Sequence, residues 1–240
     1  MAKTERKPKP VKSRRKRPLL TLFLFVLAFP FLQVAVLRFV PSPPTILMIQ
    51  QAIKGNGLDY RWRSLDRMSP YLVTAAIAAE DARFCSHKGF DFDAIEKAMK
   101  ANERAEARGS SKMRGGSTIT QQTAKNVFLW PQRSYVRKGL EAGYSVLIEY
   151  GWGKRRIMEM YLNVAEFAPG VYGAEAASRH WFGKSSRNLS RAEAARLVAV
   201  LPSPRRYNAA SPGPYVRRRT ARIQANAAQV RVQGLNQCAI

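Results

Sequence analysis

Cysteine, histidine and acidic residues are all scarce in this sequence of 240 residues. Its two cysteines, Cys85 and Cys238, and two histidines form neither a disulfide framework nor the Cys/His spacing of a zinc site. Only 16 Asp and Glu oppose 41 Lys and Arg, so the formal net charge is +25 at pH 7. Because so many cations attract polyanions, this balance indicates a phosphate-bearing partner such as anionic lipid or nucleic acid.

Repeats, low-complexity tracts and alternating β-type runs are also scarce. The best candidate strand is residues 45–49, and helix signals dominate the rest. Apolar residues make up 46% and aromatic residues 10%, which is enough to bury a core and argues against wholesale disorder. We therefore expect a mainly α fold with one domain and appendages.

The amino-terminal region combines a basic tail with a long apolar run. Residues 1–18 hold nine Lys or Arg and one Glu, a charge of +8, which leaves +17 for the rest. Residues 19–37 carry no charge, and a helix of that length, at ~1.5 Å per residue, crosses a bilayer core. A cleaved signal peptide would have a shorter apolar region and a small-x-small site, so a retained anchor is favoured. The basic tail then stays cytoplasmic and the body crosses to the other side.

The expected organisation follows from these signals. Residues 1–18 are a cytoplasmic tail, 19–40 a transmembrane helix, 41–65 a linker that begins with a proline-rich stretch, and 66–240 the folded domain. Residues 102–116 should form a mobile loop. We expect helices after Ser69-Pro70, from Asp91 to about Lys100, from Ser117 or Thr118 to Phe128, from Ser134 to about Tyr150, from Lys154 to Asn163, after the Ser190–Glu193 capping box, and from Tyr215 to Val232.

Two acids, Glu80 and Asp81, end an alanine-rich apolar helix. The helix dipole and apolar neighbours such as Ile77 both disfavour a charged carboxylate there, so they make it more basic. Glu80 is thus a candidate general base. The alternative is a solvated helix end with Arg83 as an ion-pair partner, and a lone histidine such as His87 is more often structural than catalytic.

A glycine-rich stretch, RGGSTITQQTAKN (residues 114–126), leads into another helix. Free N–H groups at such a helix start bind anions. Ser117, Gln121 and Lys125 are spaced i, i+4 and i+8 and would form a polar stripe. An ordinary capped surface helix is the alternative.

A third cluster places cations at the front of the next helix. Arg133, Arg137 and Lys138 oppose the helix dipole there, with Glu141 as the one acid, although Arg137 to Glu141 is also a routine i, i+4 pair. A base, an anion cradle and clustered cations together suit the displacement of a phosphate-linked leaving group.

The motifs EDARFCSHKG, RGGSTITQQTAKN, RKGLE and RRIMEMYLNVAEFAPGVYGAEAASRHWFGK resemble, in order, the signature motifs of the peptidoglycan glycosyltransferase family. The resemblance covers about residues 66–212. The family comprises bifunctional penicillin-binding proteins and a stand-alone form, the monofunctional biosynthetic transglycosylase. A chain that ends at Ile240 leaves no room for a transpeptidase domain and resembles the latter.

The resemblance implies a lysozyme-like, mainly helical domain that polymerises lipid II into β-1,4-linked glycan strands, with inversion and release of undecaprenyl diphosphate. It makes Glu80 the general base, Lys125 and Arg133 the cations that stabilise the diphosphate, and Glu141 a catalytic donor-site residue. A divalent cation, Mg²⁺ or Mn²⁺, would bind with the substrate diphosphate, and no organic cofactor is expected. The other motif positions matched to the substrate cleft are Asp81, Phe84, His87, Gly116, Ser117, Thr118, Gln121, Gln122, Asn126, Arg137 and Lys138.

Partners and location follow from the same resemblance. We expect lipid II, the growing glycan strand and the membrane as partners, with transpeptidases and division or elongation proteins as further candidates and no nucleic acid. The location would be a bacterial inner membrane, with the catalytic domain in the periplasm. Two other functions stay open: a lysozyme-like lytic enzyme that cleaves peptidoglycan, and a non-catalytic, membrane-anchored binder of polyanions.

Overall fold

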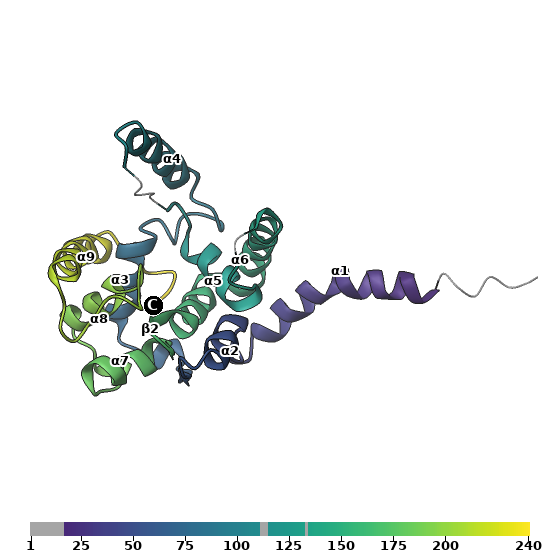
Figure 1. The fold of residues 1–240 in the computed structure, drawn as a ribbon, viewed down its shortest axis with the longest axis horizontal. Coiled ribbons are helices and arrows are strands. Elements are labelled where there is room, and N and C mark those ends of the chain that lie inside the picture. The colour runs from purple at the N-terminus through teal and green to yellow at the C-terminus, as the bar shows by residue number, and fades with distance from the viewer. Residues whose placement is uncertain (1–16, 111–114, 133) are drawn as a thin grey trace, which may run out of the picture.

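The first helix, α1 (Arg17–Leu37), is the long apolar helix that the sequence predicts, and it projects away from the rest of the chain (Figure 1). The structure is a computed structural model that describes residues 17–110, 115–132 and 134–240. Most large apolar side chains of α1 are exposed, and within the described residues it is the helix long and apolar enough to cross a membrane. The chain is mainly α, as predicted.

The last turns of α1 are fastened to α6 (Tyr135–Val164). The indole Nε1 of Trp152 donates to Val34 O at 2.7 Å, and the Tyr144 hydroxyl donates to Gln33 Oε1 at 2.6 Å. The Arg156 guanidinium donates to Leu37 O, one of the carbonyl groups that a helix end leaves unpaired. The anchor is therefore joined directly to the body.

The expected strand at residues 45–49 is wrong, because this segment forms α2 (Ile46–Ile53). Thr45 caps the helix by accepting from Met48 N at 3.5 Å, and the Met48 side chain is fully buried. The period of the buried side chains is thus helical. Segment 41–65, expected as a linker, also contributes η1 (Leu65–Arg67) and β1 (Asp59–Tyr60).

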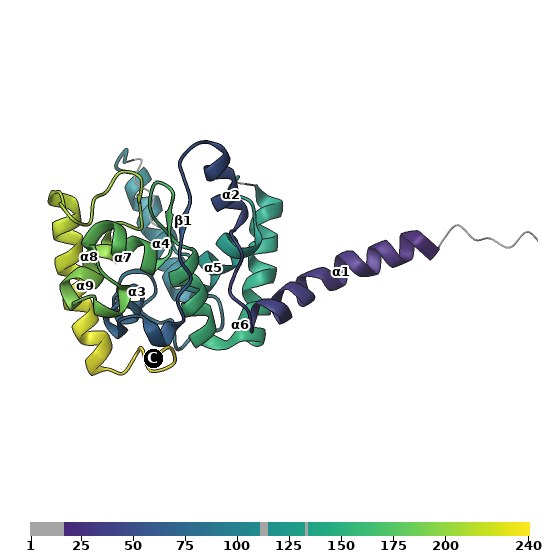
Figure 2. The ribbon, with the colours of Figure 1, turned by 90° about the horizontal axis from the view of Figure 1, so that it is seen from below.

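Helix α3 (Pro70–Glu80) runs through the core, and every residue from 72 to 78 is buried. α8 (Arg191–Ala199) and α9 (Pro214–Val232) pack against it, on the side of the body away from α1 (Figures 1 and 2). Small alanine side chains on α3 and α8 let these helices approach closely. The Ser190–Glu193 capping box is confirmed, whereas the Ser69 hydroxyl donates to Leu189 O instead of capping α3.

Three helices form the other part of the body: α4 (Phe92–Glu106), α5 (Ile119–Phe128) and α6. α5 packs along α6, while α4 stands apart (Figure 1). Residues 102–106, predicted as part of a loop, are the last turn of α4. α6 joins the two helices expected from 134 to 150 and from 154 to 163, across a break at Gly153, whose φ of 74° favours glycine.

A small sheet closes the fold beneath α7 (Ala174–Phe182) and η2 (Ser186–Asn188). Its order is β1-β3-β2, with β1 parallel and β2 (Glu166–Ala168) antiparallel to β3 (Val171–Tyr172). Gly170 makes the β2–β3 turn possible, because its φ is 70° and a Cβ there would meet Asn56 O at 2.0 Å. The expectation that the two cysteines form no disulfide is wrong, because the fold brings Cys85 and Cys238 together across 153 residues and joins them in a disulfide.

Candidate active site

Glu80 is the last residue of α3 and lies mostly buried at the base of a cleft of about 800 Å³. The cleft is lined by the end of α3, the first turns of α4, residues 115–118 and one face of α9. Gln122 Nε2 donates to Glu80 Oε2 at 3.2 Å, and Arg219 Nη2 donates to Oε1 at 2.8 Å. Two helices remote in sequence, α5 and α9, therefore fix the two oxygens of one carboxylate.

Burial raises the pKa of the Glu80 carboxyl above its ordinary value, although the contacts with Gln122 and Arg219 oppose the rise and the nearby Asp81 adds to it. The direction agrees with the basicity expected from the sequence, and desolvation is its main cause. A carboxylate with a raised pKa at the wall of a cleft is suited to accept a proton.

The other acids that line the cleft are already engaged. Asp81 accepts from His87 Nε2 at 2.9 Å and from Ile119 N at 3.0 Å. Asp91 accepts from Ala94 N at 3.0 Å as the N-cap of α4, and Asp93 pairs with Arg83. Arg83 therefore serves α4 rather than Glu80. Among the described acids of the cleft, Glu80 is the one whose pKa is raised.

Asp81 also changes the expected anion cradle at the start of α5. Its carboxylate takes the Ile119 N–H, while Thr118 and Gln121 satisfy each other's N–H groups in a capping box, at 3.1 and 3.2 Å. The negative charge that a helix N-terminus favours is thus supplied by the protein itself. Ser117 precedes the N-cap and Gln121 folds back onto Thr118, so the expected stripe from Ser117 to Lys125 is not continuous.

Some of the residues predicted to contact the substrate line the cleft, whereas others pack beneath its wall. Phe84 is fully buried, with Lys154 Nζ at 4.6 Å from its ring centroid. His87 is buried against Asp81. Gly116 lines the cleft next to α4, where a Cβ would meet Ile95 Cα at 3.1 Å. The structure thus separates the lining positions, which include Gly116, Ser117, Thr118 and Gln122, from the supporting ones.

The remaining predicted residues gather around a second, smaller pocket of about 280 Å³. Lys125, Asn126 and Arg137 line it. Glu141 is buried beside it and pairs with Lys138 Nζ at 2.5 Å and Arg137 Nη1 at 3.4 Å. The pocket is distinct from the Glu80 cleft, although Lys125 follows Gln122 by one turn of α5. Arg133 lies outside the described residues, so its predicted role stays a prediction.

The motifs in the sequence do not point to Arg219. It lies in the arginine-rich stretch of α9, residues 217–222, beyond the end of the recognised motifs. Its Nη2 contacts Glu80, and its buried Nε has no hydrogen-bond partner among the residues that the structure describes. The helical period of α9 is the one signal that could have indicated Arg219. Val216, Thr220 and Ile223 form the buried face of the helix, and Arg219 lies at the edge of that face.

The described residues contain no cluster of three or more His, Cys, Asp or Glu that could hold a metal ion. The acids that line the cleft fit this finding, because Asp81, Asp91 and Asp93 already bind side chains or backbone N–H groups. A divalent cation would therefore need ligands from its substrate.

Comparison with known proteins identifies the family of the chain. A family model described as "Transglycosylase" matches residues 48–228, which defines the chain as an enzyme of the glycosyltransferase class. The chain belongs to the transglycosylase family, as its motifs predict, and the match extends beyond them to include α2 and most of α9.

Relatives named biosynthetic peptidoglycan transglycosylase match nearly the whole chain. That of Caulobacter vibrioides is 54% identical over 220 residues, which cover 92% of this chain and 94% of the relative. That of Xanthomonas campestris pv. campestris is 50% identical over 229 residues, covering 92% and 91%. That of Pseudomonas aeruginosa is 49% identical over 214 residues, covering 87% and 90%.

Proposed function

We propose that this peptidoglycan transglycosylase polymerises lipid II into β-1,4-linked glycan strands with Glu80 as the general base. The observation that carries the proposal is a single buried carboxylate with a raised pKa in a cleft of about 800 Å³, between an amide and an arginine. The family of the chain and the names of its relatives supply the substrate class.

The reaction is a displacement at the anomeric carbon of the donor sugar. Glu80 removes the proton from the 4-hydroxyl of the acceptor sugar as that oxygen forms a bond to the anomeric carbon. The bond from this carbon to the diphosphate oxygen breaks on the opposite face, so the configuration inverts. Undecaprenyl diphosphate leaves with the bonding electron pair. Because a diphosphate is a good leaving group, cations can stabilise it and no strong acid is needed.

The second pocket suits the leaving group. Lys125 and Arg137 line it, and Lys138 lies beside it with Glu141, so positive charge is concentrated next to the wall that carries Gln122. The described lining of this pocket offers no carboxylate to a metal ion, so a divalent cation, Mg²⁺ or Mn²⁺, would be held by the diphosphate oxygens of the substrate and would supply further positive charge to them. Lys125 would contribute to the same neutralisation from α5, and Arg133 from the segment before α6.

The location is part of the same proposal. A single-pass inner-membrane anchor, with the basic tail in the cytoplasm, would put the catalytic domain in the periplasm. The Cys85–Cys238 disulfide supports this side of the membrane, because disulfides persist in oxidising compartments. An anchored, basic body would meet lipid II at the bilayer surface. Transpeptidases and division or elongation proteins would be its protein partners.

The decisive experiment uses purified full-length protein in detergent with labelled lipid II, with and without moenomycin. We expect lengthening glycan strands whose formation moenomycin blocks. Glu80→Gln should lower turnover about 10²- to 10⁴-fold while lipid II still binds. Glu103→Gln, at an exposed position on α4, is the matched control and should keep wild-type turnover.

Each other outcome identifies a different function. Shortening of preformed glycan strands would replace the polymerase with a lytic enzyme. Binding of lipid II without any product, unchanged in Glu80→Gln, would leave only a membrane-anchored binder of polyanions.

A further inference from the structure

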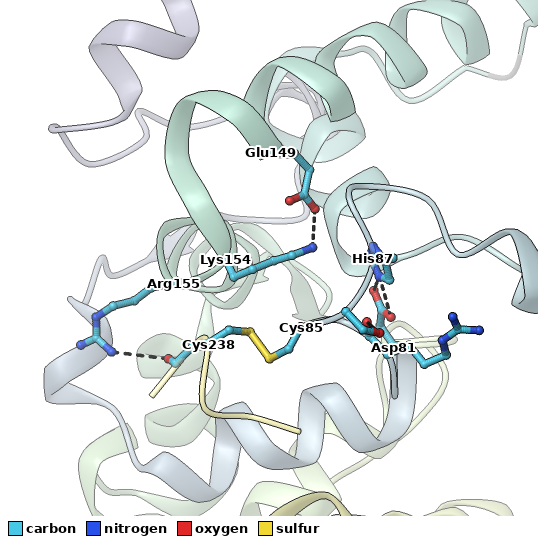
Figure 3. The surroundings of a disulfide bond; sticks show 10 residues. Asp81, Cys85, His87, Glu149, Lys154, Arg155 and Cys238 are labelled. Atoms are coloured by element: carbon cyan, nitrogen blue, oxygen red, sulfur yellow. Dashed lines mark hydrogen bonds and ion pairs between the residues drawn. A yellow bond between two sulfur atoms is a disulfide. The ribbon is translucent and has the colours of Figure 1, made fainter. Parts of the chain in front are cut away.

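A disulfide joins the loop that follows Glu80 to the carboxyl-terminal end of the chain (Figure 3). Cys85 lies five residues after Glu80, and the Cα atoms of Cys85 and Cys238 are 5.6 Å apart. The same loop contains the buried pair of Asp81 and His87, through which it contacts the start of α5. The disulfide therefore attaches to a short segment that helps to shape the wall of the cleft.

The carboxyl-terminal residues 233–240, here called the C-terminal strap, are held at two further points. Asn236 Nδ2 donates to Thr74 Oγ1 of α3 at 2.9 Å, and both side chains are buried. Ala239 is fully buried, and its carbonyl oxygen lies 3.5 Å from Arg155 Nη1 of α6. The strap thus follows α9 and returns to the core beside α3.

The strap and the cleft share two walls. One wall is the end of α3 with Glu80, and the other is α9 with Arg219; the two meet through the hydrogen bond from Arg219 Nη2 to Glu80 Oε1. Covalently, α9 continues into the strap, which contains Cys238, and the disulfide leads from there back through Cys85 to Glu80. A closed ring therefore connects both partners of the Glu80–Arg219 pair.

This ring restrains the opening of the cleft. Backbone hydrogen bonds such as Leu235 N to Val230 O join the start of the strap to α9. Beyond them, the hydrogen bonds that hold the strap to α3 and α6 in the described residues are the one from Asn236 to Thr74 and the long one from Arg155 to Ala239 O, together with its apolar packing. Terminal segments held by few contacts open locally at low free energy. The cross-link connects segments 153 residues apart, and such long-range bonds also stabilise the whole fold against unfolding.

We propose that the Cys85–Cys238 disulfide is a redox-dependent cross-link that holds the C-terminal strap and positions Glu80 against α9. The catalytic cleft then becomes fully ordered only in an oxidising compartment. The proposal rests on the proposed function of Glu80. The bond forms between the two Sγ atoms as their thiols lose two electrons and two protons. A small disulfide such as oxidised glutathione accepts them and is itself cleaved to two thiols.

The test compares full-length protein in three forms: oxidised, reduced with dithiothreitol, and the double variant Cys85→Ser, Cys238→Ser. Because the chain has only two cysteines, any effect of the reductant that the double variant does not show arises from this bond. We expect reduction to lower kcat with lipid II about tenfold with little change in KM, because misplacement of the base affects the chemical step. The melting midpoint should fall by about 5 to 10 °C.

Amide hydrogen exchange supplies a readout that does not depend on activity. Reduction should speed exchange in residues 81–89 and in the strap, and hardly at all in α5. Free thiols on Cys85 and Cys238 in protein isolated from membranes without reductant would overturn the proposal. Equal kcat and equal exchange in the oxidised, reduced and double-variant forms would also overturn it.

If the proposed function is wrong, the polymerisation assay gives a different result. If oxidised protein makes no polymer, or Glu80→Gln polymerises normally, the assignment of Glu80 is wrong. In that case the positioning role of the disulfide falls with it, whatever the exchange rates show. Normal polymerisation by oxidised protein with no effect of reduction rejects the strap alone.

Discussion

Two glutamates of this chain, Glu80 and Glu175, are both largely removed from solvent, but they differ in the number of hydrogen-bond donors around the carboxylate. Glu80 ends α3 and receives hydrogen bonds from Gln122 and Arg219. Glu175, in the first turn of α7, receives them from Ser185, Ser186, Arg63 and Arg179, with Ser186 donating through both its N–H and its hydroxyl.

The two pKa values move in opposite directions. Burial raises the pKa of Glu80, and its two donors do not offset the rise. Burial also acts on Glu175, but the donors around it outweigh burial and lower its pKa to about 2. Burial alone therefore does not make a base. A buried carboxylate becomes basic where the fold supplies few donors, and that condition holds at the cleft rather than at α7.

The largest expected difference between Glu175 and Glu80 is in how replacement by Gln changes the free energy of unfolding. Glu175→Gln should lower the free energy of unfolding by about 3 kcal/mol at pH 7, because it leaves the guanidinium groups of Arg63 and Arg179 without their carboxylate. Denaturant unfolding in detergent, followed by tryptophan fluorescence, measures the change. Glu80→Gln should leave the unfolding free energy equal or higher, since it removes a charge that burial disfavours.

The pH dependence of this difference has a defined sign. The pKa of Glu175 is lowered in the folded state, so its contribution is fully present above the ordinary glutamate pKa of 4.5 and is lost as the pH falls towards about 2. The stability gap between wild type and Glu175→Gln should therefore close over that range. A gap that stays constant down to pH 2 would show that the lost contacts, and not the charge, carry the effect.

A smaller effect is expected at Arg219. Its charge lowers the pKa of Glu80, so Arg219→Gln should move the acidic limb of the kcat/KM profile to higher pH. Asp81 and the buried Tyr161 of α6 also face Glu80 electrostatically and stay unchanged in this variant. Arg222→Gln, exposed on the same helix, is the control and should leave the profile in place. An identical shift in both variants would show that the net charge of the protein, and not the contact between Arg219 and Glu80, changes the pKa of Glu80.

The smallest expected effect concerns the helix that carries Gln122 to Glu80. Thr118→Ala removes the side-chain cap of α5, which accepts from Gln121 N at 3.2 Å, and should lower the unfolding free energy by about 1 kcal/mol. Thermal unfolding of this variant beside Ser117→Ala, which lies one residue before the cap, measures it. Equal midpoints for the two variants would contradict a capping role.

Particular residues show how far the sequence alone could go. Asp91, Ser134 and Ser190 each cap a helix as predicted, because a cap is a local interaction between neighbouring residues. The strand expected at residues 45–49 failed, because a short apolar run does not distinguish a strand from a buried helix. Asp81 lines the cleft beside Glu80, but its use as the anion at the start of α5 depends on a contact across 38 residues.

The sequence by itself determined the apolar anchor, the helical class, the family and the position of Glu80 at a helix end, since each depends on residues close together in the chain. Only the tertiary structure decided that Arg219 reaches Glu80, that Lys125 lines a separate pocket with Glu141 buried beside it, and that Cys85 bonds Cys238. These results depend on how α3, α5, α6 and α9 pack against one another. Burial of apolar surface drives that packing, and the long-range polar pairs form where the packed helices bring their partners together.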